Sequence, residues 1–374
     1  MGTLENDRAL LILARAGLPA ATLRALLEAR PDPAAALDAA RHGAGLGLAP
    51  AALMALRHPV PVQLAADLAW RAGPGHRLLG WQDPDYPALL RRSPNPPPLL
   101  FVAGDAGLLW HPQVAIVGSR HPSAGGRERA HRFAEAFARA GWAVTSGLAE
   151  GIDAAAHAGA MAGGRTIAVV GTGPDRCYPA SHAGLMARIA AGGAVVTEHP
   201  PGTDALASHF PSRNRIIAGL SLGTVVIEAA MRSGALISAR LAAEAGREVF
   251  ALPGSVDNPT ARGCHRLIRD GAALVESPGE VVEALAPVAQ SLAEALRGRL
   301  KTTPPPPAAR SARGQAPADD DHNRLWSALG HDPTGMDSLA ERTGLTVAAL
   351  SSMLLVMELE GRVVADNGRY ARRP

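Results

Sequence analysis

The sequence is poor in cysteine, lysine and aromatic residues, and it has no long apolar run. Its 374 residues include only two cysteines, which excludes a disulfide-stapled fold and is typical of a reduced, cytosolic protein. No apolar run reaches the ~18 residues that a membrane-spanning helix needs. The polar residues 1–7 lack the pattern of a signal peptide. We therefore expect a cytoplasmic protein with no membrane partner.

Basic charge is not concentrated in any part of the chain. The formal net charge is +3, and residues 1–110, 111–298 and 299–374 each hold one more basic than acidic residue. This distribution excludes a basic tail or a global positive field, so any contact with nucleic acid must come from local clusters. Aromatic residues number five Trp, three Tyr and five Phe, so the position of each is informative.

Changes of composition predict three folded regions. Residues 1–72 are rich in Ala and Leu and are broken by Gly and Pro, which predicts a small helical domain of the SAM or helix-hairpin-helix type, for packing or for backbone contact with DNA. Residues 73–298 form the predicted core, which begins with an irregular, Pro-rich lead-in over 73–110. The proline run in 299–318 predicts a linker. Residues 319–374 predict three helices and a β-ribbon, as in a winged helix.

Short β-branched runs alternate with helical patterns in the core. This alternation is typical of a mostly parallel sheet covered on both faces, the doubly wound, Rossmann-like α/β class. In such sheets ligands bind beyond the carboxyl ends of the strands. The runs lie at 114–117, 142–146, 166–170, 194–197, 224–228 and 248–252.

Glycine and small hydroxyl residues follow several of these runs. At the start of a helix such residues expose backbone amides, which suit phosphate. A tight turn explains any one of these loops, whereas their repetition favours a ligand that carries phosphate. The candidate residues are Gly118, Ser119, Arg120, Ser146, Gly147, Ser233 and Gly234, with Ser233 expected to cap a helix.

The segment 209–215 combines Phe210, Arg213, Asn214 and Arg215. A guanidinium binds phosphate with two hydrogen bonds and stacks on bases, and an aromatic face offers a stacking surface. These residue types suit single-stranded nucleic acid. A solvated turn around a core phenylalanine is the alternative for this segment taken alone.

Signatures of enzymes and metal sites are weak. The chain has no GxxxxGK[ST] loop, and residues 171–176 lack the third glycine of a dinucleotide fingerprint. Asp153 and His157 are spaced i,i+4, which is typical of a local pair, and nothing presents Ser146 as a nucleophile. The histidines and cysteines show no metal-ligand spacing. We expect no catalytic residue, no cofactor and no metal.

A series of short motifs runs through residues 113–275 in a fixed order. They are VAIVGSR at 114–120, SGLAEGID at 146–153 with His157, TIAV at 166–169, Gly171 and Gly173, Tyr178 and Pro179, FPSRNRIIAGLS at 210–221, Glu228 and Ala229, Ser233 and Gly234, Gly246 and Arg247, Pro253 and Gly254, and Gly263 and Cys264. In these motifs the segment resembles the DprA/Smf family (DNA processing protein A). Three departures from the family pattern, Thr197, Ser238 and His265, remove no charged or aromatic ligand.

The resemblance implies single-strand DNA binding without catalysis. It implies a role in natural transformation and recombination, in which the protein protects incoming single strands, helps load RecA and acts as a homodimer; duplex DNA stays open as a second ligand. It assigns phosphate and base contacts to all the candidates of the strand-end loops and of segment 209–215. The alternative is a nucleotide-processing enzyme of the phosphoribohydrolase type, but residues 231–238 (MRSGALIS) lack that family's catalytic glutamate.

The predicted recognition helix of the tail, 346–360, contains no Arg or Lys. Major-groove reading normally relies on such side chains. We therefore expect the tail to contact protein, or to bind a DNA backbone weakly through Arg362, Arg369, Arg372 and Arg373.

Overall fold

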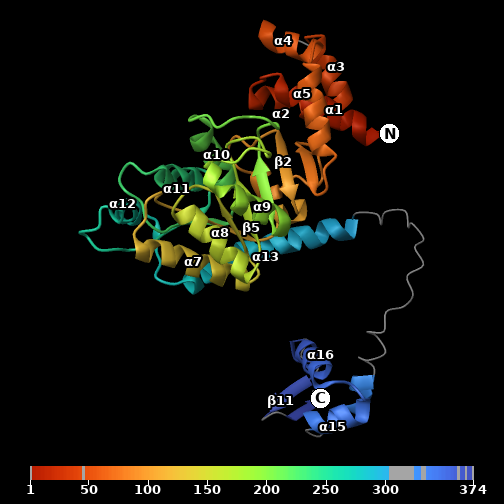
Figure 1. Cartoon of the computed structure of the whole chain (residues 1–374), viewed down its shortest axis with the longest axis vertical. Coiled ribbons are helices and arrows are strands. Elements are labelled where there is room, and N and C mark those ends of the chain that lie inside the picture. Colours follow the sequence, from red (N-terminus) through yellow and green to blue (C-terminus); the bar gives the residue numbers. More distant parts are fainter. Residues whose placement is uncertain are drawn as a thin grey trace. The chain divides into compact units, whose positions relative to one another are not determined.

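The computed structural model describes residues 2–43, 47–302, 324–329, 334–359, 363–366 and 369–372 (Figure 1). The chain divides into two compact units, Met1–Thr302 and Thr303–Pro374. Residues 299–302 of the predicted linker belong to the long helix α13, and the rest of that linker lies outside the described residues. Within the described residues, no helix has the length and apolarity to cross a bilayer.

A nine-stranded sheet forms the centre of the first unit. Its order is β1-β2-β6-β5-β4-β3-β7-β8-β9, and all neighbours are parallel except the pairs β1/β2 and β2/β6. The predicted doubly wound, mostly parallel sheet is thereby confirmed. The strands are β1 His76–Gly80, β2 Leu99–Gly104, β3 Gln113–Val117, β4 Ala143–Ser146, β5 Thr166–Val169, β6 Ala194–Thr197, β7 Gly223–Val226, β8 Glu248–Ala251 and β9 Ala273–Leu274.

The residues 73–110, predicted as an irregular lead-in, contain two of these strands. β1 and β2 pair in antiparallel register, and β2 pairs with β6. Prolines surround β2 but lie outside it, so its ladder of backbone hydrogen bonds is complete. The expectation of irregular structure was therefore wrong for 76–80 and 99–104. This segment also holds α6 Ala88–Arg91 and the 3₁₀ helix Ala106–Trp110.

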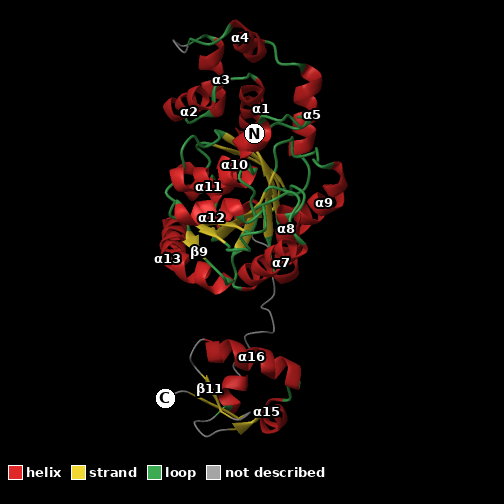
Figure 2. Cartoon of the chain, turned by 90° about the vertical axis from the view of Figure 1, so that its left-hand side faces the viewer, coloured by secondary structure: helices red, strands yellow, loops and turns green. Residues whose placement is uncertain are grey.

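Helices cover both faces of the sheet (Figure 2). Successive strand residues point to opposite faces, so Val114 and Ile116 of β3 pack in the cluster of α7, α8 and α13, while Ala115 and Val117 pack in that of α10, α11 and α12. The helices are α7 Ala124–Arg139, α8 Ile152–Gly163, α9 Ala183–Gly192, α10 His209–Leu220, α11 Gly234–Glu244, α12 Arg262–Arg269 and α13 Pro278–Thr302, with a 3₁₀ turn at Ala180–His182.

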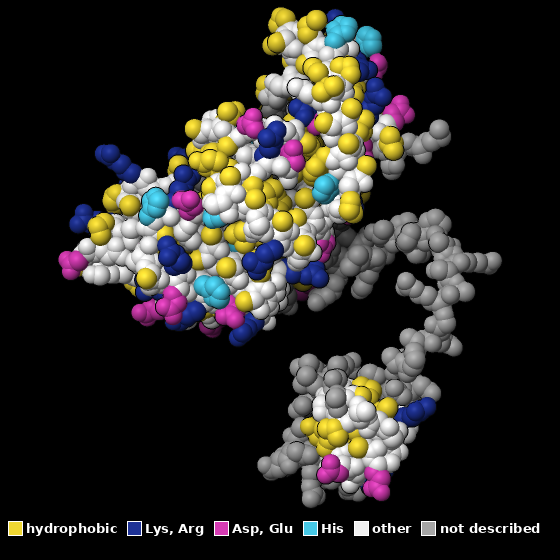
Figure 3. Space-filling model, in the orientation of Figure 1, with side chains coloured by type: hydrophobic (Ala, Val, Ile, Leu, Met, Phe, Trp, Pro, Cys, Tyr) yellow, Lys and Arg dark blue, Asp and Glu magenta, His cyan; other side chains and the backbone are white. Residues whose placement is uncertain are grey.

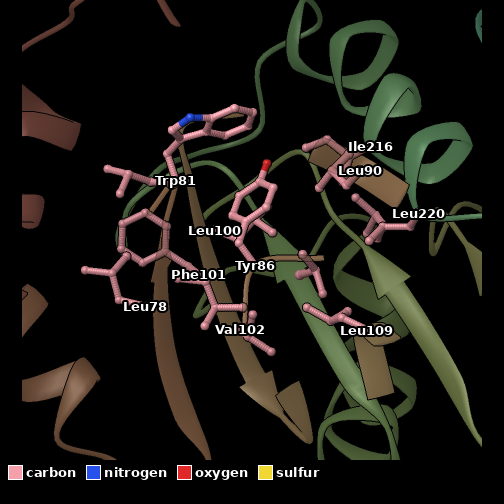
Figure 4. Packing of buried hydrophobic residues seen from close by; sticks show 14 of the residues in the cluster. Leu78, Trp81, Tyr86, Leu90, Leu100, Phe101, Val102, Leu109, Ile216 and Leu220 are labelled. Carbon is pink, nitrogen blue, oxygen red and sulfur yellow. The ribbon is translucent and has the colours of Figure 1, made fainter. Parts of the chain in front are cut away.

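The described part of residues 2–72 forms five helices. Proline stands in the first turn of α3, α4 and α5, where its missing N–H costs nothing. Figure 4 shows Leu78 of β1, Trp81 just after it and Phe101 of β2 packed together. Leucines of α1 and α2 belong to the same buried cluster. This N-terminal bundle therefore shares its core with the sheet. Its helices are α1 Gly2–Arg15, α2 Ala20–Ala29, α3 Pro33–Arg41, α4 Pro50–Arg57 and α5 Pro61–Arg71.

The second unit has the winged-helix arrangement that its sequence predicts. A helical stretch over 324–328 precedes β10 Thr334–Gly335, α15 Met336–Thr343, α16 Val347–Leu359, β11 Val363–Asp366 and β12 Arg369–Arg372. The strands form an antiparallel sheet in the order β10-β12-β11.

Arg372, expected to be available for a DNA backbone, packs within its own unit. Its guanidinium donates to the carbonyl oxygen of Trp326 and lies 4.5 Å from the centroid of that indole ring. This contact uses Arg372 for packing. Arg362 and Arg373 lie outside the described residues.

The close contact of α7 with α8 depends on Gly159. A Cβ at this position would lie 2.1 Å from the carbonyl oxygen of His131, so Gly159→Ala should lower the free energy of unfolding by about 1–3 kcal/mol. Gly184→Ala in α9 is the control, because nothing lies within 4 Å of its Cβ; it should be neutral or stabilising by about 0.4–1 kcal/mol. Urea unfolding followed by circular dichroism measures both. Equal stability of the two variants would contradict this packing.

Candidate nucleic-acid interface

A cavity of about 710 Å³ lies at the carboxyl ends of β3 and β7. The chain passes from β3 to β4 on one side of β3, while β7 lies on its other side, so the cavity is at the switch point of the sheet. Its walls come from residues after β3, from α10 with the loop before it, and from residues 230–238.

The structure gathers most of the predicted site residues in this cavity. Gly147 lines a smaller cavity of about 90 Å³, which shares Arg120, Phe210 and Arg213 with the large one. Ser146 and Arg215 lie outside the described walls of both. The predicted residues that line the large cavity are Gly118, Ser119, Arg120, Phe210, Arg213, Asn214, Ser233 and Gly234.

Helical periodicity sorts the residues of segment 209–215. Phe210, Arg213 and Asn214 are spaced i, i+3 and i+4 on α10, so they share the face toward the cavity. Arg215 is turned about 200° from Arg213. Its guanidinium binds Glu198 with two hydrogen bonds of 2.8 and 2.6 Å. Arg215 therefore holds α10 against the end of β6 and does not face the cavity.

Arg213 forms the floor of the cavity. Its side chain is buried and donates to the carbonyl oxygens of Gly147, after β4, and Val169, at the end of β5. Burial lowers the pKa of Arg213 to about 10, partly offset by Asp153, so the side chain is cationic at neutral pH. A Cβ on Gly147 would lie 2.5 Å from this guanidinium, which explains the glycine.

The backbone amides that were expected to hold phosphates already have protein acceptors. The amides of Gly147 and Ala149 donate to Oδ2 of Asp153, at 3.1 and 3.3 Å. The amide of Ser119 donates to the carbonyl oxygen of Glu228. The hydroxyl of Ser146 donates to the carbonyl oxygen of Ile116, 2.7 Å away. At these positions the fold uses the groups internally, and the contact of Ser119, Ser146 and Gly147 with phosphate stays a prediction.

The start of α11 remains directed at the cavity. The hydroxyl of Ser233 accepts from the amide of Ala235, which confirms the predicted cap. A Cβ on Gly234 would have nothing within 4 Å, so this first turn is open. The positive end of the helix dipole and the exposed Arg232 therefore meet at one wall.

An aromatic pair, an exposed Tyr178 and a half-buried Phe210, lines both cavities. The ring of Tyr178 lies 5.1 Å from that of Phe210, centroid to centroid, and Tyr178 is 51% exposed. The guanidinium carbon of the exposed Arg120 lies 6.0 Å from the Phe210 ring centroid. Tyr178 was missed as a site residue, although the scarcity of tyrosine was a signal. Arg232 was also missed, although it directly precedes the predicted Ser233.

The structure does not assemble the residues considered as a catalytic triad. Nδ1 of His157 lies 2.8 Å from the hydroxyl of Thr166, while Ser146 donates to Ile116. Burial, with smaller effects of Arg213 and His182, lowers the pKa of His157 to about 3, so the ring is neutral. Within the described ranges, no group of three or more His, Cys, Asp or Glu side chains is placed to hold a metal ion.

Comparison with known proteins identifies the family. Residues 77–286 match the family model of DNA recombination-mediator protein A, and residues 303–369 match that of the DprA winged helix domain. The chain belongs to the DprA/Smf family. Protein Smf of Escherichia coli is 40% identical over 311 residues, which cover 83% of this chain and 80% of that protein. DprA of Streptococcus pneumoniae is 46% identical over 201 residues, 54% of this chain and 71% of that protein.

Two solved DprA structures share the fold. The X-ray structure of the Streptococcus pneumoniae protein aligns with a TM-score of 0.66 and 36% identity, over 74% of this chain and 97% of that one. DprA from Helicobacter pylori, whose structure is described for its single-stranded DNA binding mode, aligns with a TM-score of 0.51 and 27% identity, over 56% and 95%. The DprA winged-helix match agrees with the second unit of the chain.

The carboxylate of Glu228 fixes the underside of this DprA cavity. Its oxygens accept from the amide and hydroxyl of Ser123, at 2.9 and 2.6 Å, and from the hydroxyl of Thr260, at 3.1 Å. Burial by itself would raise the pKa of Glu228, but these hydrogen bonds and Arg129 outweigh it, so the pKa lies below the ordinary 4.5.

Replacement of Glu228 by glutamine should destabilise the protein in a pH-dependent way. At neutral pH the loss should be about 1–3 kcal/mol, because an amide cannot accept all three hydrogen bonds. A carboxyl with a lowered pKa stabilises the folded state above its unfolded pKa, and this contribution disappears as pH falls through the folded value. The stability difference between wild type and Glu228→Gln should therefore shrink below about pH 4.5. Urea unfolding at pH 7, 5 and 3.5 measures it; a constant difference would contradict the assignment.

Proposed function

We propose that this protein binds single-stranded DNA in the cavity at the ends of β3 and β7. The observation that carries the proposal is the rim formed by Arg120, Phe210 and Tyr178. A cation beside aromatic rings that are exposed (Tyr178) or half-buried (Phe210) binds phosphate and stacks bases without reading sequence. On the face drawn in Figure 3, the described Lys and Arg side chains are scattered and form no continuous basic patch.

The site residues divide by role in this proposal. Asn214 lies beside Phe210 on α10, and Ser233, Gly234 and Arg232 line the cavity at the start of α11. Gly118 and Ser119 form the floor beside β3. Arg213 and Gly147 lie beneath the bound DNA strand. Ser146 acts indirectly by its hydrogen bond to the backbone of Ile116, and Arg215 by holding α10 through Glu198.

We further propose that the protein acts in natural transformation and recombination, where it protects incoming single strands and helps load RecA without catalysis of its own. A cytoplasmic homodimer suits this role. β9 is an edge strand of the nine-stranded sheet, and Leu274 on it is 48% exposed, which supports association through that edge. We also propose that the chain consists of an N-terminal domain at 1–72, a core at 73–298, a linker at 299–318 and a winged helix at 319–374. The N-terminal domain and the core share one buried cluster, and α13 continues from the core to residue 302.

The alternative, a phosphoribohydrolase-type enzyme, needs a carboxylate free to act on a nucleotide. Among the described lining residues of the large cavity, Asp153 is engaged by two backbone amides, and the nearby Glu228 has three hydrogen-bond donors. Both observations favour binding over catalysis in the large cavity. Glu150, which lines the smaller cavity, is exposed. Release of free base from nucleoside monophosphates would support the enzyme instead.

Arg120→Ala should weaken binding of a dT oligomer by about 1.5–3 kcal/mol, because a charged hydrogen bond to phosphate is lost. The slope of log affinity against log salt should fall by about 0.7, the value for one phosphate contact on a single strand. Fluorescence anisotropy at several salt concentrations measures both. Arg139→Ala is the control, since this exposed arginine ends α7 just before β4 begins, at the end of the strands away from the cavity. Identical losses in the two variants would refute the contact.

Tyr178→Ala and Phe210→Ala should each weaken binding by about 1–3 kcal/mol, because a stacked base loses its platform. The salt slope should stay unchanged, since no charge is removed. Tyr178→Phe keeps the ring and should bind as wild type does in the same anisotropy assay. Undiminished affinity in both alanine variants would remove the aromatic pair from the site.

A further inference from the structure

One guanidinium joins the N-terminal bundle to the loop that leads to the cavity. Arg15, at the end of α1, donates two hydrogen bonds to Asp67 of α5, at 2.5 and 2.6 Å. The Asp67 side chain is fully buried. The same guanidinium donates to the carbonyl oxygen of Pro201, 2.8 Å away. Because the paired carboxylate oxygens fix the guanidinium plane, Pro201 is tied to a rigid point of the bundle.

Pro201 lies near the start of the 199–208 loop, which runs from β6 to α10. The loop is anchored around this point, since the amide of Gly202 donates to Asp175 and the carbonyl oxygen of Thr203 accepts from the amide of Gly173. Ala205 and Ala207, a few residues further on, line the cavity. Residues 204–208 are exposed and have little packing of their own. The anchored residues 201–203 therefore determine where this wall of the cavity begins.

The loop leads directly into the first turn of α10, which carries Phe210. The amide of His209 donates to the carbonyl oxygen of Leu206, so the last part of the loop and the start of the helix are one hydrogen-bonded segment. A shift of the anchored end is therefore carried to the aromatic rim.

We infer that Arg15 is a positioning residue for DNA binding, which holds the 199–208 loop and, through it, Phe210. The inference rests on the proposed function. In this role the N-terminal bundle supports DNA binding without touching DNA, because it holds the loop that forms one wall of the cavity.

The test variant must remove the bond to Pro201 and keep the bundle folded. Arg15→Ala would leave the buried carboxylate of Asp67 without a partner, which destabilises proteins strongly. The double variant Arg15→Met, Asp67→Leu replaces the ion pair by apolar side chains, an exchange that proteins commonly tolerate. Arg24→Met is the matched control, because Arg24 also ties the bundle to the core, through Asn95 and Pro96, away from the loop.

Full-length protein is assayed for affinity to a dT oligomer over a salt series, for hydrogen exchange in the loop, and for stability in urea. The double variant should bind roughly 2- to 30-fold more weakly, as expected of a residue that acts at a distance. Its salt slope should be unchanged and the amides of the loop should exchange faster. Arg24→Met should bind as the wild type does. When the double variant is combined with Phe210→Ala, the fold loss of affinity should be smaller than the product of the two separate fold losses. The reason is that both changes act through the ring of Phe210.

Wild-type affinity in the double variant, or an equal loss in Arg24→Met, would overturn the positioning role. A reduced salt slope would also overturn it, since it would mean that Arg15 contacts phosphate directly. If the wild type itself fails to bind the oligomer, the proposed function fails first and the positioning role falls with it.

Discussion

The buried guanidinium of Arg213 is the contact on which the rest of the site depends. It joins the ends of β4 and β5 to α10 through the carbonyl oxygens of Gly147 and Val169. Burying a cation is costly unless it is hydrogen-bonded, so this contact fixes the rotation of the helix. Once that rotation is set, Phe210 and Asn214 face the cavity and Arg215 faces Glu198.

The same constraint changes what the cavity can offer a ligand. Asp153, on the helix after β4, accepts from the amides of Gly147 and Ala149, so the protein's own carboxyl group takes the place where a Rossmann-like site commonly receives a phosphate. What remains accessible is the start of α11, the cations Arg120 and Arg232, and the aromatic rim. That combination suits a flexible chain with exposed bases better than a compact nucleotide held by its phosphates.

Sequence periodicity was sufficient for the architecture and for the segments that form the site. The buried strands could be predicted because their signals are local, whereas β2 was hidden by the prolines around it and the helix at 209–220 was not predicted. The direction in which each side chain points, into the cavity or away from it, could not be predicted. Separating Arg213 from Arg215 requires knowing where α10 begins and that Glu198 lies beside it. Predicting the role of Asp153 requires the path of the loop after β4. Predicting that of Tyr178 requires the contact of its loop with α10, which is distant in sequence.

Photo-cross-linking tests the central claim most directly. A dT oligomer with a single 5-iodouracil, bound to the full-length protein and irradiated, forms covalent bonds to aromatic side chains that stack on it, and mass spectrometry locates them. The account predicts cross-links at Tyr178 and Phe210, which disappear when unlabelled single strands compete. Cross-links confined to the N-terminal bundle or to the winged helix, with none at these two rings, would contradict it.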